Sequence, residues 1–233
     1  MKVEMPDCQH CKSRRHSLFH FCHLDELEDV SMSKTCSSYK RGQILFQEGS
    51  KPLGIYCINE GKIKVYKYAS DGKEQIIRIA KPGDFVGYCS LLSENRYPVS
   101  AAALEDSQVC LVPKDNVLSL FRDNRNFNEG LVKLLCSTVE NSYEKMADLA
   151  YKPVKGRLAE ALLLLHTTYT TDDNPDGIIS ITREDLASLV GTVKETAIRV
   201  LKDFKEDNLI TTDKTKIIIQ DQQGLVRISR LYD

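Results

Sequence analysis

Cysteine and histidine concentrate in the first 36 residues, where their types and spacing suit metal or redox chemistry. Cys8 and Cys11 form a C-x-x-C pair, and Cys22 and the distant Cys110 complete the four thiolates that an iron–sulfur cluster needs. Zinc or haem is an alternative cofactor, because thiolate and imidazole ligands suit zinc and haem iron. A further alternative is that the thiols bind no metal and respond to oxidation directly. The histidines available to a zinc site are His10, His16, His20 and His23.

A second candidate site is the segment 182–210, which predicts two short amphipathic helices joined by a tight turn. Apolar residues at helical spacing mark one face of each helix, and Gly191 stands in the turn between them. Thr182, with Asp185 three positions later, is close to a helix-capping box. The outer face of the second helix carries basic side chains, which suit the major groove of DNA. The alternative is an ordinary helical hairpin with a solvated charged face. The polar residues of that outer face are Lys194, Glu195, Arg199, Lys202 and Lys205.

The sequence patterns of two other regions predict the domains that carry these candidate sites. Between about Ser37 and Pro113, short β-prone runs alternate with turn signals such as Asp71-Gly72, which predicts an antiparallel β-barrel or jelly roll. Further on, the runs Leu209–Thr211 and Lys216–Ile219 flank a charged turn, as in the wing of a winged helix. The predicted fold class is therefore α+β, with an N-terminal barrel and a C-terminal winged helix-turn-helix.

A long helix is predicted between these two parts, over about residues 126–150, and an apolar helix follows it. One seam of the long helix suits either a two-chain coiled coil or packing on the chain's own barrel. The seam consists of Leu131, Leu134, Leu135, Thr138, Ser142, Lys145 and Leu149. The predicted domains are a Cys/His-rich segment 1–36, a β-barrel 37–125, a long helix 126–150 and a winged-helix domain 151–233.

Composition restricts the class of protein. The length of 233 residues suits two modest domains, and the chain contains no run of eighteen apolar residues, so we expect no membrane span. The N-terminus lacks a secretory signal, and we expect a cytoplasmic protein. A net charge of −1 means that DNA binding needs clustered basic residues. In the cytoplasm we expect no disulfide framework, and we interpret Cys57, Cys89 and Cys136 as small buried hydrophobic residues.

The order of parts and several short motifs make the chain resemble the CRP/FNR family of bacterial transcription regulators along nearly its whole length. The resemblance implies a homodimer that is paired through the long helix and reads a palindromic operator in double-stranded DNA. It also implies that the barrel 37–125 senses an effector, that the helix 126–150 is the dimerisation helix, and that RNA polymerase is a further partner. The motifs are Pro82-Gly83-Asp84 followed by Phe85-Val86-Gly87, the run Ala103–Cys110, Asp148-Leu149-Ala150 followed by Gly156-Arg157-Leu158-Ala159, and the run Gly191–Leu201 with its E-T-x-x-R-x-L ending.

The resemblance implies roles for side chains of the second helix. Glu195 corresponds to a residue that accepts from a cytosine amine, and Arg199 to one that donates to guanine. The resemblance also implies that Lys194 contacts either a base or only a phosphate. Ile198 stands at a position where the two best-known branches of the family have Gly or Ser. The resemblance therefore does not imply the exact operator sequence. The other predicted DNA-binding residues are Thr182, Thr192 and Thr196, as phosphate contacts, and Lys202.

The resemblance also bears on cofactors and effectors. The cyclic-AMP branch holds its ligand with a Glu and an Arg, and Tyr88 and Val99 stand at those positions here. We therefore expect no cyclic AMP, and regard Tyr88, Val99 and Ser100 as the candidate lining of an effector pocket. In the oxygen-sensing branch Cys110 corresponds to the distant cluster ligand. That branch's third cysteine is missing, because residues 12–16 contain no Cys.

These observations predict a sequence-specific DNA-binding transcription regulator that responds to a redox, gas or small-molecule signal through its barrel. The alternative within this class is an iron–sulfur or other metal-containing sensor of oxygen or nitrosative stress. The alternative of another class is a ligand-binding module that does not bind DNA. We expect no enzyme, because the barrel region contains no histidine and its carboxylates lie mainly at turns.

Overall fold

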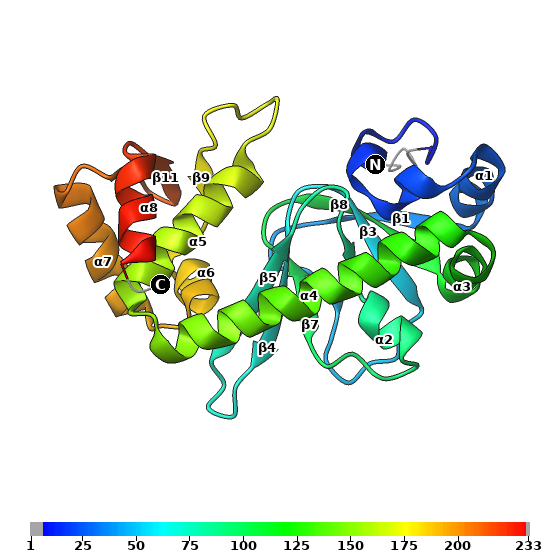
Figure 1. The fold of residues 1–233 in the computed structure, drawn as a ribbon, viewed down its shortest axis with the longest axis horizontal. Helices are drawn as coiled ribbons and strands as arrows, with labels where there is room; N and C mark the ends of the chain where they lie inside the picture. The colour runs from blue at the N-terminus through cyan, green and yellow to red at the C-terminus, as the bar shows by residue number, and fades with distance from the viewer. Residues whose placement is uncertain (1–6, 232–233) are drawn as a thin grey trace. The chain divides into compact units, whose positions relative to one another are not determined.

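A computed structural model describes residues 7–231 of the chain (Figure 1). The described residues form two compact units. Unit 1 contains the chain up to Lys67 together with Ile77–Glu140, and unit 2 contains Tyr68–Ile76 together with the chain from Asn141 onward. Within the described residues, no helix combines the length and the apolar character that a membrane crossing requires. The predicted four-part division begins in residues that are not described, and it stays a prediction.

The N-terminal segment of unit 1 folds into short helices. The turns η1 (Lys12–His16) and η2 (Leu18–Phe21) are 3-10 helices, and α1 (Leu24–Ser33) is an α-helix. Glu26 caps the start of α1, because its carboxylate accepts a hydrogen bond from the His23 N–H at 2.7 Å. The buried side chains of this segment share one apolar core with the rest of unit 1. This core includes Phe19, Leu27, Val30, Phe85, Phe127 and Leu131.

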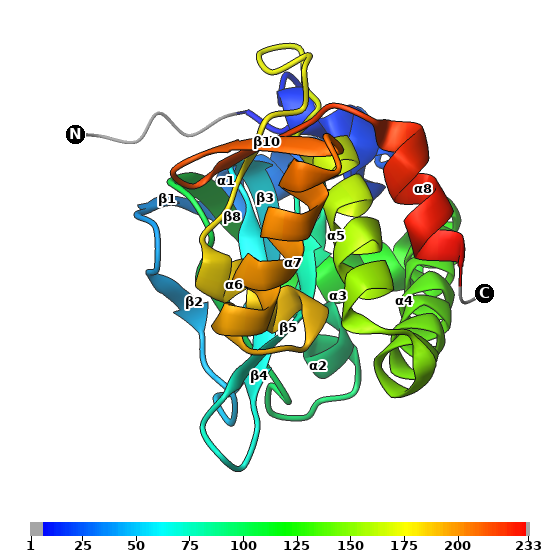
Figure 2. The ribbon, with the colours of Figure 1, turned by 90° about the vertical axis from the view of Figure 1, so that its left-hand side faces the viewer.

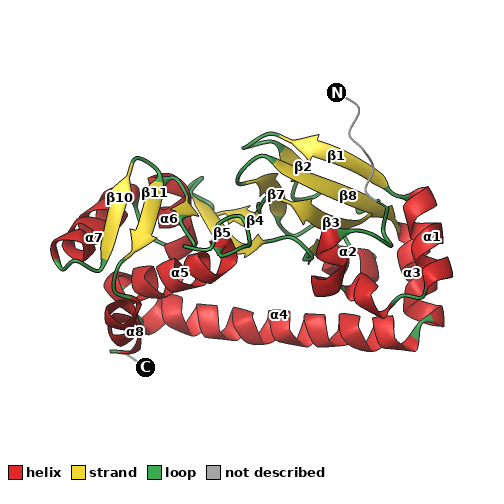
Figure 3. Cartoon of the chain, turned by 90° about the horizontal axis from the view of Figure 1, so that it is seen from above, coloured by secondary structure: helices red, strands yellow, loops and turns green. Residues whose placement is uncertain are grey.

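Two four-stranded sheets make a jelly-roll-like domain (Figure 3). Their strand orders are β1-β8-β3-β6 and β2-β7-β4-β5. The predicted barrel is not closed, because the edge strands of one sheet are not hydrogen-bonded to those of the other. The strands are β1 (Thr35–Tyr39), β2 (Ile44–Phe46), β3 (Gly54–Glu60), β4 (Ile63–Tyr68), β5 (Glu74–Ala80), β6 (Phe85–Val86), β7 (Ser100–Ala103) and β8 (Ser107–Pro113), with the short helix α2 (Tyr88–Leu92) after β6.

The long helix is confirmed. It is α4 (Arg125–Tyr151), which follows α3 (Lys114–Asp123) after the single residue Asn124. The side-chain oxygen of Asn124 accepts a hydrogen bond from the Phe127 N–H at 2.8 Å. This bond satisfies one of the free amides at the start of α4 and fixes where the helix begins.

The predicted seam of α4 packs on the chain's own domain over its first half. Leu131 is buried, and Leu134 and Leu135 pack against the same apolar core. Further along, the Lys145 ammonium donates a hydrogen bond to the carbonyl of Ile76 at 2.8 Å, within unit 2. The first half of this seam therefore packs against the chain itself, whereas Ser142 and Leu149 further along it are exposed.

Unit 2 contains the predicted winged helix-turn-helix. Figure 2 shows α6 and α7 beside α5, which is the apolar helix that the sequence predicts. The small sheet has the order β10-β11-β9 with antiparallel pairs, so the predicted wing is confirmed. The elements are α5 (Val154–Tyr169), β9 (Ile179–Ser180), α6 (Arg183–Val190), α7 (Lys194–Glu206), β10 (Ile210–Asp213), β11 (Lys216–Ile219) and α8 (Gln222–Arg230).

Candidate nucleic-acid interface and thiol centre

Helix α7 has one buried face and one exposed face. Its buried side chains are Ala197, Val200, Leu201 and Phe204, the apolar residues that the sequence assigns to this face. They anchor the helix on unit 2 and leave its opposite side in solvent. Such an arrangement suits a helix that enters the major groove of DNA. The exposed side chains are Lys194, Glu195, Ile198, Arg199, Lys202 and Lys205.

The helix before α7 is held by a cap and a glycine turn. The Thr182 hydroxyl accepts a hydrogen bond from the Asp185 N–H at 3.0 Å and lies 2.5 Å from the Asp185 carboxylate, so the predicted cap is confirmed. Gly191 ends α6 with a φ of 70°. A Cβ at this position would lie 2.5 Å from the side chain of Leu149. Glycine is therefore required by the backbone angle and by the close packing.

The wing is fastened to the start of α6. The Arg183 guanidinium donates a hydrogen bond to the carbonyl of Lys214 at 3.0 Å, and the Ile181 N–H donates to the carbonyl of Thr215 at 3.2 Å. Burial lowers the pKa of Arg183 from its ordinary value. These bonds join the β10–β11 turn to α6 and hold the wing in place.

Some of the predicted DNA-binding residues lie together on α7, whereas others lie outside its exposed face. Lys194, Glu195, Arg199 and Lys202 all project from α7, whereas Thr182 caps α6. The Lys194 ammonium lies 2.6 Å from the Glu184 carboxylate, and this hydrogen bond raises the pKa of Lys194. Thr192 and Thr196 are half-buried near the start of α7. Their predicted phosphate contacts remain predictions.

A second apolar seam on α4 was missed by the sequence analysis. It is exposed, and its residues are separated alternately by four and three positions, which is the spacing of the buried seam of a two-chain coiled coil. This spacing can be recognised from the sequence alone, beside the seam that packs inward. The outer seam consists of Val132, Cys136, Val139, Tyr143 and Met146.

The cysteines depart from the sequence-based expectation. Cys36 on β1 and Cys110 on β8 form a disulfide, although we expected no disulfide framework. The two residues lie directly opposite each other in the β1–β8 register, which brings their side chains together. Cys57 is buried as expected, but Cys89 and Cys136 are exposed, because α2 and α4 turn these positions toward solvent.

The predicted ligands do not fit an iron–sulfur cluster. The sulfur of Cys110 is bonded to Cys36, so it supplies no thiolate. Burial, together with the nearby Glu26 carboxylate, raises the pKa of Cys22 to about 12. Throughout residues 7–231, three or more His, Cys, Asp or Glu side chains nowhere gather in a group that could hold a metal ion. Cys8, Cys11, Cys22 and Cys110 are therefore not assembled as a ligand set.

The candidate effector residues make contacts within unit 1. The Tyr88 hydroxyl lies 2.8 Å from the Thr138 hydroxyl, and the Arg78 guanidinium stands 5.7 Å from the centre of the Tyr88 ring. Val99 packs against the sheet core, and the Ser100 hydroxyl accepts a hydrogen bond from the Glu48 N–H. A cavity of about 300 Å³ in this unit is lined by other residues, including Arg15, His16, His20, Arg78 and Phe85.

Comparisons with known proteins match both parts of the chain. The family profile "Cyclic nucleotide-binding domain" matches residues 36–124, and the profile "Crp-like helix-turn-helix domain" matches residues 156–228. The "CRP-like cAMP-activated global transcriptional regulator" of Mycobacterium tuberculosis is 28% identical over 194 residues, which cover 82% of this chain and 87% of the relative. The "Fumarate and nitrate reduction regulatory protein" of Yersinia pestis is 28% identical over 208 residues, covering 88% and 82%.

The chain belongs to the CRP/FNR family of transcription regulators, which carry a helix-turn-helix DNA-binding domain. Solved structures agree on the fold. FixK2 from Bradyrhizobium japonicum superimposes with a TM-score of 0.77 over 86% of this chain and 99% of that chain, at 22% identity.

The cap of α6 predicts a measurable loss of stability. Replacing Thr182→Ala removes the oxygen that accepts from the Asp185 N–H. We expect the free energy of unfolding to fall by about 1 kcal/mol, as for other lost helix caps, in a denaturant titration followed by circular dichroism. Thr182→Ser keeps the hydroxyl and serves as the matched control. Equal stability of the Ala and Ser variants would show that the cap contributes nothing.

Proposed function

We propose that this chain regulates transcription as a homodimer that binds a palindromic operator through two copies of α7. The observation that carries the proposal is α7 itself, which buries its apolar side and presents long charged side chains on the other. A helix anchored in this way and followed by a wing fits the major groove. The names of the Mycobacterium and Yersinia relatives, which both describe regulators, agree with this role.

The exposed face of α7 offers two side chains that can read bases. We assign Arg199 to the acceptor atoms of guanine, because its planar guanidinium can donate two hydrogen bonds at once. We assign Glu195, one turn earlier, to the amine of cytosine. Lys202 is assigned to a phosphate, which positions the helix without specifying a base. Lys194 has to exchange its partner Glu184 for DNA before it contributes a contact.

Dimerisation is proposed through the outer seam of α4. Tyr143 and Met146 are 66% and 65% exposed, so these large apolar side chains face water when the chain is alone. A second copy of α4 packed in parallel buries this seam along its whole length. The same pairing gives the two-fold symmetry that a palindromic operator requires.

The remaining parts of the proposal concern the signal and the partners. We assign signal sensing to unit 1, through redox chemistry or a small molecule. The Mycobacterium relative is named for activation by cAMP, but Tyr88 and Val99 lack the charges that hold a cyclic nucleotide, so we assign no cyclic AMP here. We assign this chain to the cytoplasm, where a regulator of transcription meets the chromosome. RNA polymerase is its proposed further partner, and no enzymatic activity is proposed.

The assignment of Arg199 predicts a change in sequence preference. In the Arg199→Ala variant, affinity for an operator selected by the wild-type protein falls by about 1–3 kcal/mol, and the preference at one base pair of each half-site is lost. Lys202→Ala weakens binding to all duplexes alike and reduces the slope of affinity against salt by about 1, because one phosphate contact is lost. Fluorescence anisotropy on the operator and its single-base variants measures both effects.

The matched control is Arg122→Ala, which removes an exposed arginine from α3 in unit 1. Its operator affinity and salt slope should equal those of the wild type. An Arg199→Ala protein with full affinity and unchanged base preference would refute the role of this residue. Binding with almost no salt dependence would favour the alternative that the winged helix contacts protein.

The seam predicts a specific covalent cross-link. Equivalent positions of a parallel coiled coil face each other across the two-fold axis, so Cys136 of one chain meets Cys136 of the other. Mild oxidation of the purified protein should yield a cross-linked dimer on a non-reducing gel, which disappears in Cys136→Ser. Cys89→Ser, which removes the other exposed thiol, is the control and should cross-link normally. A dimer band that persists in Cys136→Ser would place the interface elsewhere.

A further inference from the structure

The cavity of about 300 Å³ in unit 1 is lined by the N-terminal segment, the strands β5 and β6, the turn between them, and helix α4. The short helices η1 and η2 contribute Arg15 and His20. Arg78 comes from β5, Phe85 from β6 and Leu134 from α4. A volume of this size is at the lower end of the range for small-molecule pockets, so the cavity has room for a small organic ligand.

Two glycines let the N-terminal segment approach the other walls of the cavity closely. The φ of Gly83 is 93°, and a Cβ at this position would lie 2.9 Å from the carbonyl oxygen of His16. A Cβ at Gly130 on α4 would lie 2.8 Å from the ring of Phe21. A larger residue at either position would push η1 or η2 away from its neighbour. Both glycines are therefore needed to keep the cavity walls together.

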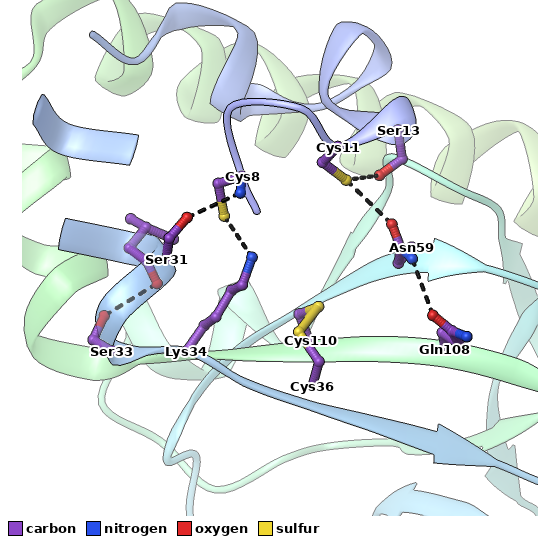
Figure 4. Close-up of a disulfide and its surroundings, with 11 residues drawn as sticks. Cys8, Cys11, Ser13, Ser31, Ser33, Lys34, Cys36, Asn59, Gln108 and Cys110 are labelled. Carbon is purple, nitrogen blue, oxygen red and sulfur yellow. Dashed lines mark hydrogen bonds between the residues drawn. A yellow bond between two sulfur atoms is a disulfide. The ribbon is translucent and has the colours of Figure 1, made fainter. Parts of the chain in front are cut away.

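Hydrogen bonds hold the N-terminal wall at both ends. The thiol of Cys11, the residue before η1, donates to the side-chain oxygen of Asn59 on β3 at 3.1 Å, and Asn59 donates to Gln108 at 3.3 Å (Figure 4). At the end of η2, the side chain of Asn124 donates to the carbonyl of Phe21 at 3.1 Å. The wall made by η1 and η2 is thus fixed, which makes it a preformed side of the cavity.

The charged side chains that line the cavity are mainly basic. The described residues contribute two guanidinium groups to the lining, those of Arg15 and Arg78, and one carboxylate, that of Asp84. The Asp84 carboxylate accepts a hydrogen bond from the Lys81 N–H at 3.0 Å, which offsets part of its charge. A guanidinium stays charged in proteins, so the cavity offers positive charge to an anion.

The two guanidinium groups differ in how they are held. Arg78 is half-buried, donates to the carbonyl of Phe85 and stands 5.7 Å from the centre of the Tyr88 ring, so its position is set. A guanidinium has five N–H donors, and this one bond leaves others for a ligand. Arg15 is exposed, and within residues 7–231 its side chain has no hydrogen-bond or ion-pair partner. It is therefore available to an anion that Arg78 binds.

Apolar side chains cover much of the remaining lining. A bare inorganic anion would leave these side chains in water, whereas an organic anion buries them and gains the hydrophobic term. The ring of Phe21 is 41% exposed, so it offers an apolar face to such a ligand. The apolar lining residues are Leu18, Phe21, Phe85 and Leu134.

We propose that this cavity binds a small organic anion, whose phosphate or carboxylate group lies on Arg15 and Arg78 and whose apolar part lies on Phe21 and Leu134. The planar guanidinium fork matches both kinds of oxyanion. The site is separate from the candidate effector pocket described above, because none of the three residues of that pocket lines this cavity. That the site serves signal sensing rests on the proposed function, whereas the binding itself does not.

A ligand in this cavity joins three parts of unit 1. Its anionic group connects η1, through Arg15, to β5, through Arg78. Its apolar part contacts Leu134 on the inner seam of α4. Because the same helix carries the outer seam, ligand binding acts on the helix through which we propose that two chains pair.

The test is isothermal titration calorimetry of the full-length protein with phenyl phosphate, benzoate and benzyl alcohol. We expect the anion of the preferred class to bind with a dissociation constant of about 0.1–1 mM, the range for ligands of this size. Benzyl alcohol, which has the ring but no charge, should bind at least about tenfold more weakly. The tighter of the two anions shows whether the site prefers a phosphate ester or a carboxylate. Inorganic phosphate should bind more weakly than phenyl phosphate, because it leaves the apolar lining uncovered.

Variants locate the binding in the cavity. Arg15→Gln and Arg78→Gln each remove one guanidinium and should weaken binding of the tighter anion by about tenfold, the usual effect of losing a hydrogen bond to a charged group. Lys12→Gln removes a positive charge from η1 outside the cavity lining and is the matched control, with an affinity equal to that of the wild type. Should Arg78→Gln fail to fold, Arg15→Gln decides, because its side chain is exposed.

Three results would overturn the site. The first is no binding of either anion, the second is benzyl alcohol binding as tightly as the anions, and the third is an Arg15→Gln protein that binds like Lys12→Gln. Operator binding is measured separately by fluorescence anisotropy. Its loss would contradict the proposed function and leave the anion titration unchanged. Equal operator affinity with and without the saturating anion would remove the sensing role.

Discussion

Helix α4 has to bury two apolar faces, and a single chain covers only one of them. The inner face, which begins at Leu131, packs on the core of unit 1. The outer seam from Val132 to Met146 stays in water unless a second chain covers it. Because the exposed residues follow coiled-coil spacing, a parallel copy of α4 meets this requirement. The symmetry of the proposed operator, and the use of two recognition helices, follow from this one constraint.

Much of the fold was predictable because its signals are local. The apolar spacing around Phe204 predicted α7, Gly191 predicted the turn before it, and Thr182 predicted the cap of α6. The predicted barrel or jelly roll is confirmed as a jelly-roll-like pair of sheets, but the strand order was not predictable, because it depends on hydrogen bonds between strands that are remote in sequence. The sequence also left undecided whether the first seam of α4 packs on its own chain or on a second one. Periodicity marks an apolar face but does not show what covers it.

The sites were harder to predict because they depend on contacts over long sequence distances. The pairing of Cys36 with Cys110 is set by the β1–β8 register, which no local pattern fixes. In the structure the same pairing leaves Cys110 without a thiolate for the predicted four-thiolate set. The contact of Lys34 with Cys8 joins the end of α1 to the N-terminal turn and has no sequence signature. The outer seam of α4, by contrast, was predictable from the sequence, because its spacing is a local pattern.

We propose that two copies of α7, joined through α4, read one palindrome. The most direct measurement is a selection of bound duplexes from a random-sequence pool by the purified protein, followed by sequencing. A dimer of this kind selects an inverted repeat whose half-sites are centred about 10–11 base pairs apart, one turn of the double helix. Enrichment of a single half-site, of direct repeats, or of no sequence at all would contradict it.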